Sequence, residues 1–185
     1  FNSHPQTGTS NEQRLMQIAV LANDASINME GQELGDPTEI AMVAFSNKMN
    51  QPFGELRAAY PREAELPFDS ERKLMSTVHT IDGERLLLTK GGPDVVFGRS
   101  TKILINGEVL PLTKELLGEI KEQNEYFSSR ALRVLAFAYG PLEEKEALDF
   151  NVEHDLILVG LMAMIDPPRE AVYAAVEEAK KAGIK

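Results

Sequence analysis

The sequence predicts an α+β fold in which an antiparallel sheet, built from hairpins, is flanked by helices. Two pairs of turn residues, Asp82-Gly83 and Asn106-Gly107, each separate two β-prone runs, and such pairs favour the left-handed backbone of two-residue hairpin turns. A nearly continuous apolar run over 156–165 then precedes a helical pattern, which is typical of a buried strand and helix in a parallel α/β layer. We therefore expect a main domain over 1–160 and the start of a second one over 161–185.

Two helices are expected near the N-terminus. Apolar side chains recur at helical spacing over 11–22, which predicts a helix with one buried face. The second helix is expected to run to about Met49 and has a strong start signal. Asp36 can cap it, Pro37 suits the first helical position, and Glu39 stands three residues after the cap, as in a capping box.

The centre of the chain is expected to form the sheet. Residues 53–67 are interrupted by Pro61 and Pro67 and are predicted to be irregular. The first hairpin pairs a strand over 72–81 with one over 84–90, and the second pairs 101–105 with 108–112. The remaining elements are a helix from Thr113 to about Arg130, a strand over 132–139, an acidic connector over 141–155, the apolar strand at 156–165 and a helix over 167–182.

Composition argues against several classes of protein. The 185 residues carry 19 Lys and Arg against 29 Asp and Glu, a formal charge of −10, so no nucleic-acid partner is expected. The absence of cysteine excludes disulfides, thiolate metal sites and cysteine nucleophiles. No apolar run approaches the roughly 20 residues of a membrane-spanning helix. The three histidines are scattered, and no P-loop motif is present.

Two segments around the first predicted hairpin are candidates for nucleotide binding. Phe68 stands just before the strand and could stack on a base, while Lys73 could meet a phosphate. A core phenylalanine beside charged strand-edge residues would give the same pattern. Lys90 ends the return strand, and the two glycines after it would let a flat ligand approach the backbone, although a strand-to-helix turn could also require them. Because the hairpin folds back, we expect Lys90 to lie near Lys73.

Two further candidates each have a plain structural explanation. Glu39 is explained by a capping box, which needs no ligand. Arg133 is a cation inside an otherwise apolar strand, and strand alternation allows it to point outward. None of the four places is specific alone, so the interpretation depends on their order and spacing.

Five strings, in this order and spacing, resemble the cytoplasmic ATP-binding portion of P-type cation-transporting ATPases of the calcium-pump-like subgroup. The resemblance extends over about residues 11–185, and the last string is the most specific. The strings are Asp36-Pro37-Thr38-Glu39, Phe68-Asp69-Ser70-Glu71-Arg72-Lys73, Lys90-Gly91-Gly92-Pro93-Asp94, Ala131-Leu132-Arg133-Val134-Leu135-Ala136, and Gly160 through Met164-Ile165-Asp166-Pro167-Pro168-Arg169.

The resemblance implies a role for each matching position. Phe68 would stack on adenine, Glu39 would accept a hydrogen bond from the adenine amino group, and Arg133 would meet the phosphates. Lys90 would line the floor of the pocket. Ser70 stands where some animal calcium pumps carry an arginine, so a lower phosphate affinity is expected. The full implied set is Glu39, Phe68, Ser70, Lys73, Met75, Lys90, Gly91, Gly92, Arg133 and Leu135.

The resemblance also implies a nucleotide-binding domain over 1–160 and, over 161–185, the hinge and the start of the phosphorylation domain. The Asp-Lys-Thr-Gly-Thr segment with the phosphorylated aspartate is not in this sequence, nor are the segments that hold Mg²⁺, so no catalytic or metal-binding residue is expected here. We expect a soluble, monomeric piece of an integral membrane protein, on the cytoplasmic face of the membrane. Its partners would be the phosphorylation and membrane domains of the intact chain.

The resulting interpretation is the ATP-binding domain of a cation pump, with calcium as the implied ion and ATP and Mg²⁺ as the implied cofactors. We expect ATP binding without turnover, with a dissociation constant on the order of 0.1–10 mM. The alternative is an interaction module of the same fold that binds no nucleotide; it should have lost Phe68 or Lys90, and both are present. A phosphatase of the haloacid dehalogenase group would need an Asp-x-Asp nucleophile near its start, which this sequence lacks.

Overall fold

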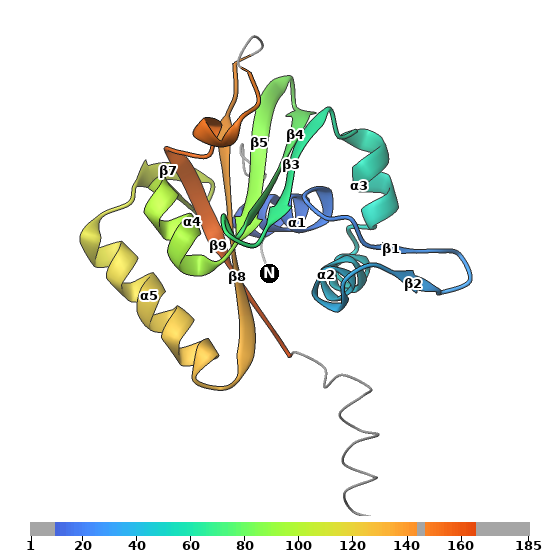
Figure 1. Cartoon of the computed structure of the whole chain (residues 1–185), viewed down its shortest axis with the longest axis horizontal. Helices are drawn as coiled ribbons and strands as arrows, with labels where there is room; N and C mark the ends of the chain where they lie inside the picture. The colour runs from blue at the N-terminus through green and yellow to red at the C-terminus, as the bar shows by residue number, and fades with distance from the viewer. Residues whose placement is uncertain (1–9, 144–146, 166–185) are drawn as a thin grey trace, which may run out of the picture.

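The computed structural model describes residues 10–143 and 147–165, which form a seven-stranded sheet with helices on both faces (Figure 1). The sheet order is β3-β4-β5-β8-β9-β6-β7, and among the described residues only the β6–β9 pair is parallel. The predicted α+β class with a hairpin-built sheet is confirmed. The strands are β3 Ala64–Asp69, β4 Leu74–Ile81, β5 Glu84–Gly91, β6 Ser100–Ile105, β7 Glu108–Pro111, β8 Leu132–Pro141 and β9 Leu156–Ile165, with a separate hairpin of β1 Ser26–Ile27 and β2 Glu33–Leu34.

The helices divide between the two faces of the sheet (Figure 1). On one face, α1 and α2 bury Ile18 and Met42 against residues such as Leu88 of β5. On the other face, α4 packs Val96 against residues such as Leu87. Successive residues of β5 therefore enter opposite layers, as strand alternation requires. No helix in the described part of the chain is long and apolar enough to cross a bilayer. The helices are α1 Asn11–Leu21, α2 Pro37–Lys48, α3 Phe53–Ala59, α4 Pro93–Arg99, α5 Lys114–Ser128 and the 3₁₀ helix η1 Phe150–Val152.

Both predicted hairpin turns are present. The φ angles are 54° and 83° at Asp82-Gly83 and 52° and 83° at Asn106-Gly107. These left-handed pairs close two-residue turns between β4 and β5 and between β6 and β7. The first turn sets a register in which Met75 pairs with Lys90, so both side chains project from the same face of the sheet.

The predicted helix starts are confirmed at α2 and α5. The backbone N–H of Thr38 donates to Asp36 Oδ1 at 2.8 Å, and that of Leu116 donates to Thr113 Oγ1 at 3.3 Å. Pro37 occupies the first helical position, where its missing N–H is not needed. The cap holds the first turn of α2 in place, which matters because this turn carries a residue of the candidate site.

The prediction that residues 53–67 are irregular is wrong, because this segment contains α3 and the start of β3. Pro52 immediately precedes α3, at its N-cap position. Pro67 lies in β3, which is an edge strand, where a missing backbone N–H removes little of the ladder. Pro52 and Pro67 therefore mark a helix start and a sheet edge, and only the short stretch around Pro61 between α3 and β3 is irregular.

β9 continues through the predicted domain boundary after residue 160. It pairs antiparallel with β8 as far as Ile165 and parallel with β6 only as far as Leu158. The expected burial on both faces holds for 156–159, whereas 161–164 are partly exposed. The predicted helix over 167–182 lies outside the described residues, so the division into 1–160 and 161–185 stays a prediction.

Candidate functional site

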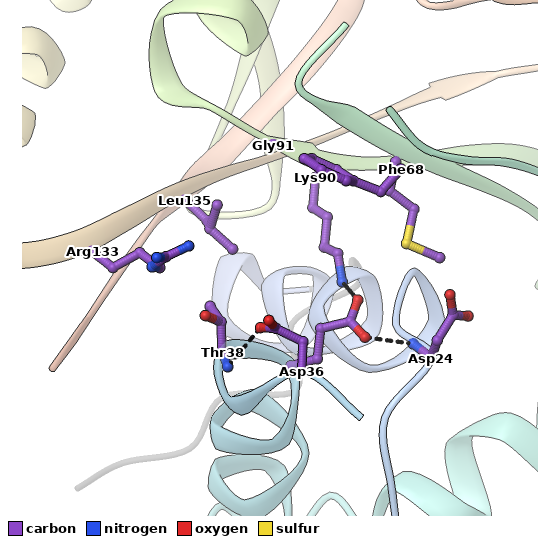
Figure 2. A pocket seen from close by; sticks show the side chains of 10 residues that line it. Asp24, Asp36, Thr38, Phe68, Lys90, Gly91, Arg133 and Leu135 are labelled. Atoms are coloured by element: carbon purple, nitrogen blue, oxygen red, sulfur yellow. Dashed lines mark hydrogen bonds and ion pairs between the residues drawn. The ribbon is translucent and has the colours of Figure 1, made fainter. Parts of the chain in front are cut away.

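A cavity of about 290 Å³ lies between the sheet and the first turn of α2 (Figure 2). Segments far apart in the sequence meet around it: the loop after α1, the start of α2, the end of β3, and strands β4, β5 and β8. The site is therefore a product of the tertiary fold and not of one motif. Its lining residues are Asp24, Asp36, Thr38, Glu39, Phe68, Met75, Lys90, Gly91, Arg133 and Leu135.

The structure brings most of the predicted binding residues to this cavity. The exceptions are Ser70, Lys73 and Gly92. Ser70 and Lys73 are exposed in the turn between β3 and β4, and Gly92 is the N-cap residue of α4. Lys73 does lie near Lys90 as expected, because the N–H of Gly92 donates to the Lys73 carbonyl at 3.0 Å. The predicted residues that line the cavity are Glu39, Phe68, Met75, Lys90, Gly91, Arg133 and Leu135.

Three lining residues were missed by the reasoning from sequence. Asp36 and Thr38 belong to a quoted string, but capping of α2 fully explained them there. Asp24 follows the end of α1, and no sequence pattern marks it. Its place depends on Arg62, which pairs with the Asp24 carboxylate at 2.7 Å and donates to the Asn23 carbonyl at 2.9 Å.

Lys90 and Glu39 form an ion pair in the cavity, and Figure 2 shows the Lys90 side chain extending from β5 toward α2. Lys90 Nζ donates to Glu39 Oε1, and the backbone N–H of Asp24 donates to Glu39 Oε2 at 3.1 Å. The side chains of Lys90 and Glu39 are 7% and 17% exposed. Burial lowers the pKa of Lys90, and the Glu39 carboxylate opposes this shift. Glu39 is thus the counter-charge of a buried lysine rather than the second half of a capping box.

The two glycines after Lys90 have different roles. A Cβ on Gly91 would lie 2.2 Å from the Lys73 carbonyl oxygen and 2.6 Å from Leu74 Cδ2, so β4 and β5 can pair here only around a glycine. A Cβ on Gly92 would lie 3.8 Å from Lys73 Cβ, which is ordinary contact. The close approach of β4 therefore accounts for Gly91, rather than the strand-to-helix turn considered from the sequence, and the Gly91 backbone also lines the cavity.

The aromatic ring and the guanidinium lie at opposite ends of the cavity, with Lys90 between them (Figure 2). Phe68 is 63% exposed, so its explanation as a core phenylalanine is wrong. Arg133 is exposed on β8 and lines the cavity together with Leu135, two residues further along the same face of the strand. This arrangement can hold a flat apolar ring at one end and an anionic group at the other.

Carboxylates also line the cavity, but they do not form an obvious metal centre. Asp24 pairs with Arg62, Asp36 caps α2, and Glu39 pairs with Lys90. Within residues 10–143 and 147–165, no group of three or more acidic or histidine side chains is placed to hold a metal ion.

Residues 11–171 match the sequence profile of the family described as P-type ATPase, cytoplasmic domain N. The chain belongs to this family. The domain is 56% identical over 187 residues to a calcium-transporting ATPase of Listeria monocytogenes, and 52% identical over 177 residues to calcium-transporting ATPase 1 of Lactococcus lactis. It is also 32% identical over 192 residues to the sodium/potassium-transporting ATPase subunit alpha-4 of Rattus norvegicus.

These matches cover nearly all of the domain but only part of each relative. They span 100%, 95% and 92% of this chain, and 21%, 20% and 18% of the three relatives in the same order. The chain therefore corresponds to about a fifth of the length of these relatives. The family resemblance read from the five strings is confirmed.

Proposed function

We propose that the cavity binds ATP, and that the domain presents this nucleotide to a phosphate-accepting aspartate elsewhere in a calcium-type P-type ATPase. The observation that carries the proposal is the convergence of Phe68, Lys90 and Arg133 on one cavity from three different strands. The names of the two bacterial relatives, both calcium-transporting ATPases, support calcium as the transported ion.

Adenine suits the Phe68 end of the cavity. The Phe68 side chain is exposed enough to offer a ring face for stacking, which contributes about 1–3 kcal/mol per base. Met75 and Leu135 add apolar surface for the ring and the ribose. Each carboxylate oxygen of Glu39 already accepts one hydrogen bond, and a carboxylate has about four acceptor positions. Glu39 can therefore also accept a hydrogen bond from the adenine amino group.

The phosphates suit the Arg133 end. Lys90 is buried and its charge is balanced by Glu39, so it has less charge to offer to a phosphate chain. Arg133 is exposed, and its planar guanidinium can bind two phosphate oxygens side by side. Mg²⁺ would arrive on the phosphates, with its protein ligands supplied mainly by regions outside this chain.

In the intact protein, closure about a hinge would carry the γ-phosphate to the aspartate. Attack of that carboxylate on phosphorus would form an aspartyl phosphate and release ADP. The intact protein would be an ATP-driven cation transporter in a membrane, with this domain on the cytoplasmic side beside the phosphorylation and membrane domains. The chain by itself would bind ATP as a monomer without turnover.

Calorimetric titration of the 185-residue chain with ATP tests the proposal. Phe68→Ala is expected to weaken ATP binding by about 5- to 150-fold through lost stacking. Tyr126→Ala is the matched control, because Tyr126 is a half-exposed aromatic on α5, outside the cavity. Unchanged affinity of Phe68→Ala would contradict the site. A folded wild-type chain that binds no ATP would contradict the function and favour the interaction module.

A second ligand separates the two ends of the cavity. Arg133→Gln is expected to weaken binding of ATP but not of adenosine, because adenosine lacks the phosphates that Arg133 would meet. Phe68→Ala should weaken both ligands, because both carry the base. Arg130→Gln, three residues earlier in the chain and outside the cavity lining, is the control for the loss of a cation.

A further inference from the structure

We propose that Arg72 and Glu153 are positioning residues that hold Phe68 in the orientation in which it stacks on ATP. This inference rests on the proposed function of the cavity. Arg72 lies in the turn between β3 and β4, and Glu153 lies in the connector that leads into β9. Neither residue lines the cavity, so both would act on the ligand through Phe68.

Phe68 stands in a β-bulge. The register of β3 with β4 shifts between Leu66 and Asp69, so Pro67 and Phe68 stand opposite the single residue Met75. A bulge interrupts the ladder and changes the direction of the side chains on it. Pro67 has no N–H and cannot donate to β4. The ladder alone therefore does not fix the direction of the Phe68 ring.

The Arg72 guanidinium supplies the support that the ladder lacks. Its Nη2 donates to the Pro67 carbonyl oxygen, and its Nη1 donates to Glu153 Oε1 at 2.5 Å. The Pro67 carbonyl belongs to the peptide group that leads directly into Phe68. Rotation of this peptide would redirect the ring, and the hydrogen bond from Arg72 opposes that rotation. The Arg72 side chain is only 8% exposed, so water competes weakly for its donors.

Glu153, which accepts the hydrogen bond from Arg72, is itself held in place by burial and by further hydrogen bonds. Its side chain is fully buried, and its Oε1 also accepts from Ser76 Oγ at 2.5 Å. Ser76 Oγ lies 2.8 Å from Thr89 Oγ1, and Thr89 directly precedes Lys90 on β5. Arg99 donates to the backbone carbonyl of Glu153 at 2.8 Å. Glu153 is thus tied to β4 and β5, the strands that carry the floor of the cavity, from the opposite face of the sheet.

A double-mutant cycle with Arg72→Lys and Phe68→Ala tests the inference by calorimetric titration with ATP. Lysine keeps a positive charge for Glu153, but its single ammonium cannot reproduce the fork that reaches both Glu153 and the Pro67 carbonyl. We expect Arg72→Lys to weaken ATP binding about 3- to 10-fold when Phe68 is present, and less than about 2-fold in the Phe68→Ala background. A purely structural role would weaken binding equally in both backgrounds.

Arg85→Lys is the matched control. Arg85 also joins a carbonyl and a carboxylate, those of Glu143 and Glu63, but at the far end of β5 from Lys90. It should leave ATP affinity unchanged in both backgrounds. If Arg72→Lys does not fold by circular dichroism, Glu153→Gln enters the same cycle with the same expected pattern.

The outcomes separate this inference from the proposed function. If Phe68→Ala itself leaves ATP affinity unchanged, the proposed site fails and the inference fails with it. If Phe68→Ala weakens binding but Arg72→Lys has no effect, or the same effect in both backgrounds, only the inference is overturned. Loss of the fold in both the Arg72 and the Glu153 variants would also overturn it, because the pair would then be a general stabilising element.

Discussion

Lys90 on β5 forms an ion pair with Glu39 in the first turn of α2, so one charge pair joins the helix layer to the sheet across the cavity. Glu39 is held from a second direction by the backbone N–H of Asp24. The distance between the helix and the sheet at this point sets the space for a ligand. The pair therefore affects both the stability of the domain and the shape of its cavity.

We predict that Lys90 and Glu39 are strongly coupled in stability. Glu39→Gln should destabilise the domain by about 3 kcal/mol, because it leaves a buried ammonium without a counter-charge. Lys90→Met should cost less, about 1–2 kcal/mol, because Glu39 is more exposed and keeps its bond from Asp24. The double variant should be more stable than the sum of the single effects by about 1–3 kcal/mol. Urea unfolding measures all three free energies.

The exposed pair of Arg85 and Glu63 provides the control for this cycle. Its side chains are 21% and 41% exposed, so its coupling should stay below about 1 kcal/mol. Additive effects at Lys90 and Glu39 would contradict the assignment of a buried, mutually dependent pair.

The two adjacent glycines are predicted to lose different amounts of stability on the same substitution to alanine. Gly91→Ala should destabilise the domain by about 2 kcal/mol or more, because its methyl group would collide with the Lys73 carbonyl and force β4 and β5 apart. Gly92→Ala should cost less than about 1 kcal/mol, because the methyl group meets only ordinary contact. Thermal unfolding of the two variants gives the comparison. Equal effects would mean that the strand approach at Gly91 can relax.

Local chemistry explains which parts of this fold could be predicted from the sequence. The turns at Asp82-Gly83 and Asn106-Gly107 and the caps at Asp36 and Thr113 depend on residues within a few positions of one another. The first of these turns also fixes where Lys90 stands relative to β4, which is why part of the site could be predicted. Segment 53–67 was predicted wrongly, whereas the strand over 156–165 was predicted with its observed bounds but not with its exposure after residue 159 or its antiparallel pairing with β8. Edge or central placement in a sheet depends on strands distant in sequence.

In the candidate site, too, the sequence does not predict the position of those single residues that depend on contacts with distant segments. Ser70 and Lys73 belong to the same string as Phe68, yet the turn exposes them outside the cavity while the bulge brings Phe68 to it. Asp24 carries no sequence signal, because Arg62, which pairs with its side chain, lies far along the chain. A string of matching residues locates a segment, whereas the direction of each side chain is set by tertiary contacts.

A buried histidine next to the site predicts how stability depends on pH. His79 on β4 is 1% exposed; its Nδ1 lies 2.9 Å from the Tyr60 carbonyl oxygen and its Nε2 lies 2.9 Å from Thr77 Oγ1. Because a carbonyl only accepts, Nδ1 carries the hydrogen and Nε2 accepts from the Thr77 hydroxyl. Burial lowers the pKa of His79, helped by the nearby charge of Arg62 and opposed by the Tyr60 carbonyl and by Glu63.

The sign of the effect follows from the two protonation states. In the unfolded chain the imidazole takes up a proton near its ordinary pKa of 6.5. In the folded domain it stays neutral at that pH, because its pKa is lowered. The stability that His79 contributes is therefore complete above pH 6.5. It is lost as the pH falls from 6.5 toward the lowered pKa of the folded state, by at most about 1.4 kcal/mol per pH unit.

Urea unfolding between pH 7 and about pH 5 measures this slope, in a window above the range in which most carboxylates titrate. His79→Gln should flatten it, because an amide can donate to the Tyr60 carbonyl and accept from Thr77 without taking up a proton. His154→Gln is the control for the loss of an imidazole at the surface, because the His154 side chain is 65% exposed. A slope that persists in His79→Gln would assign the acid sensitivity to another group in the domain.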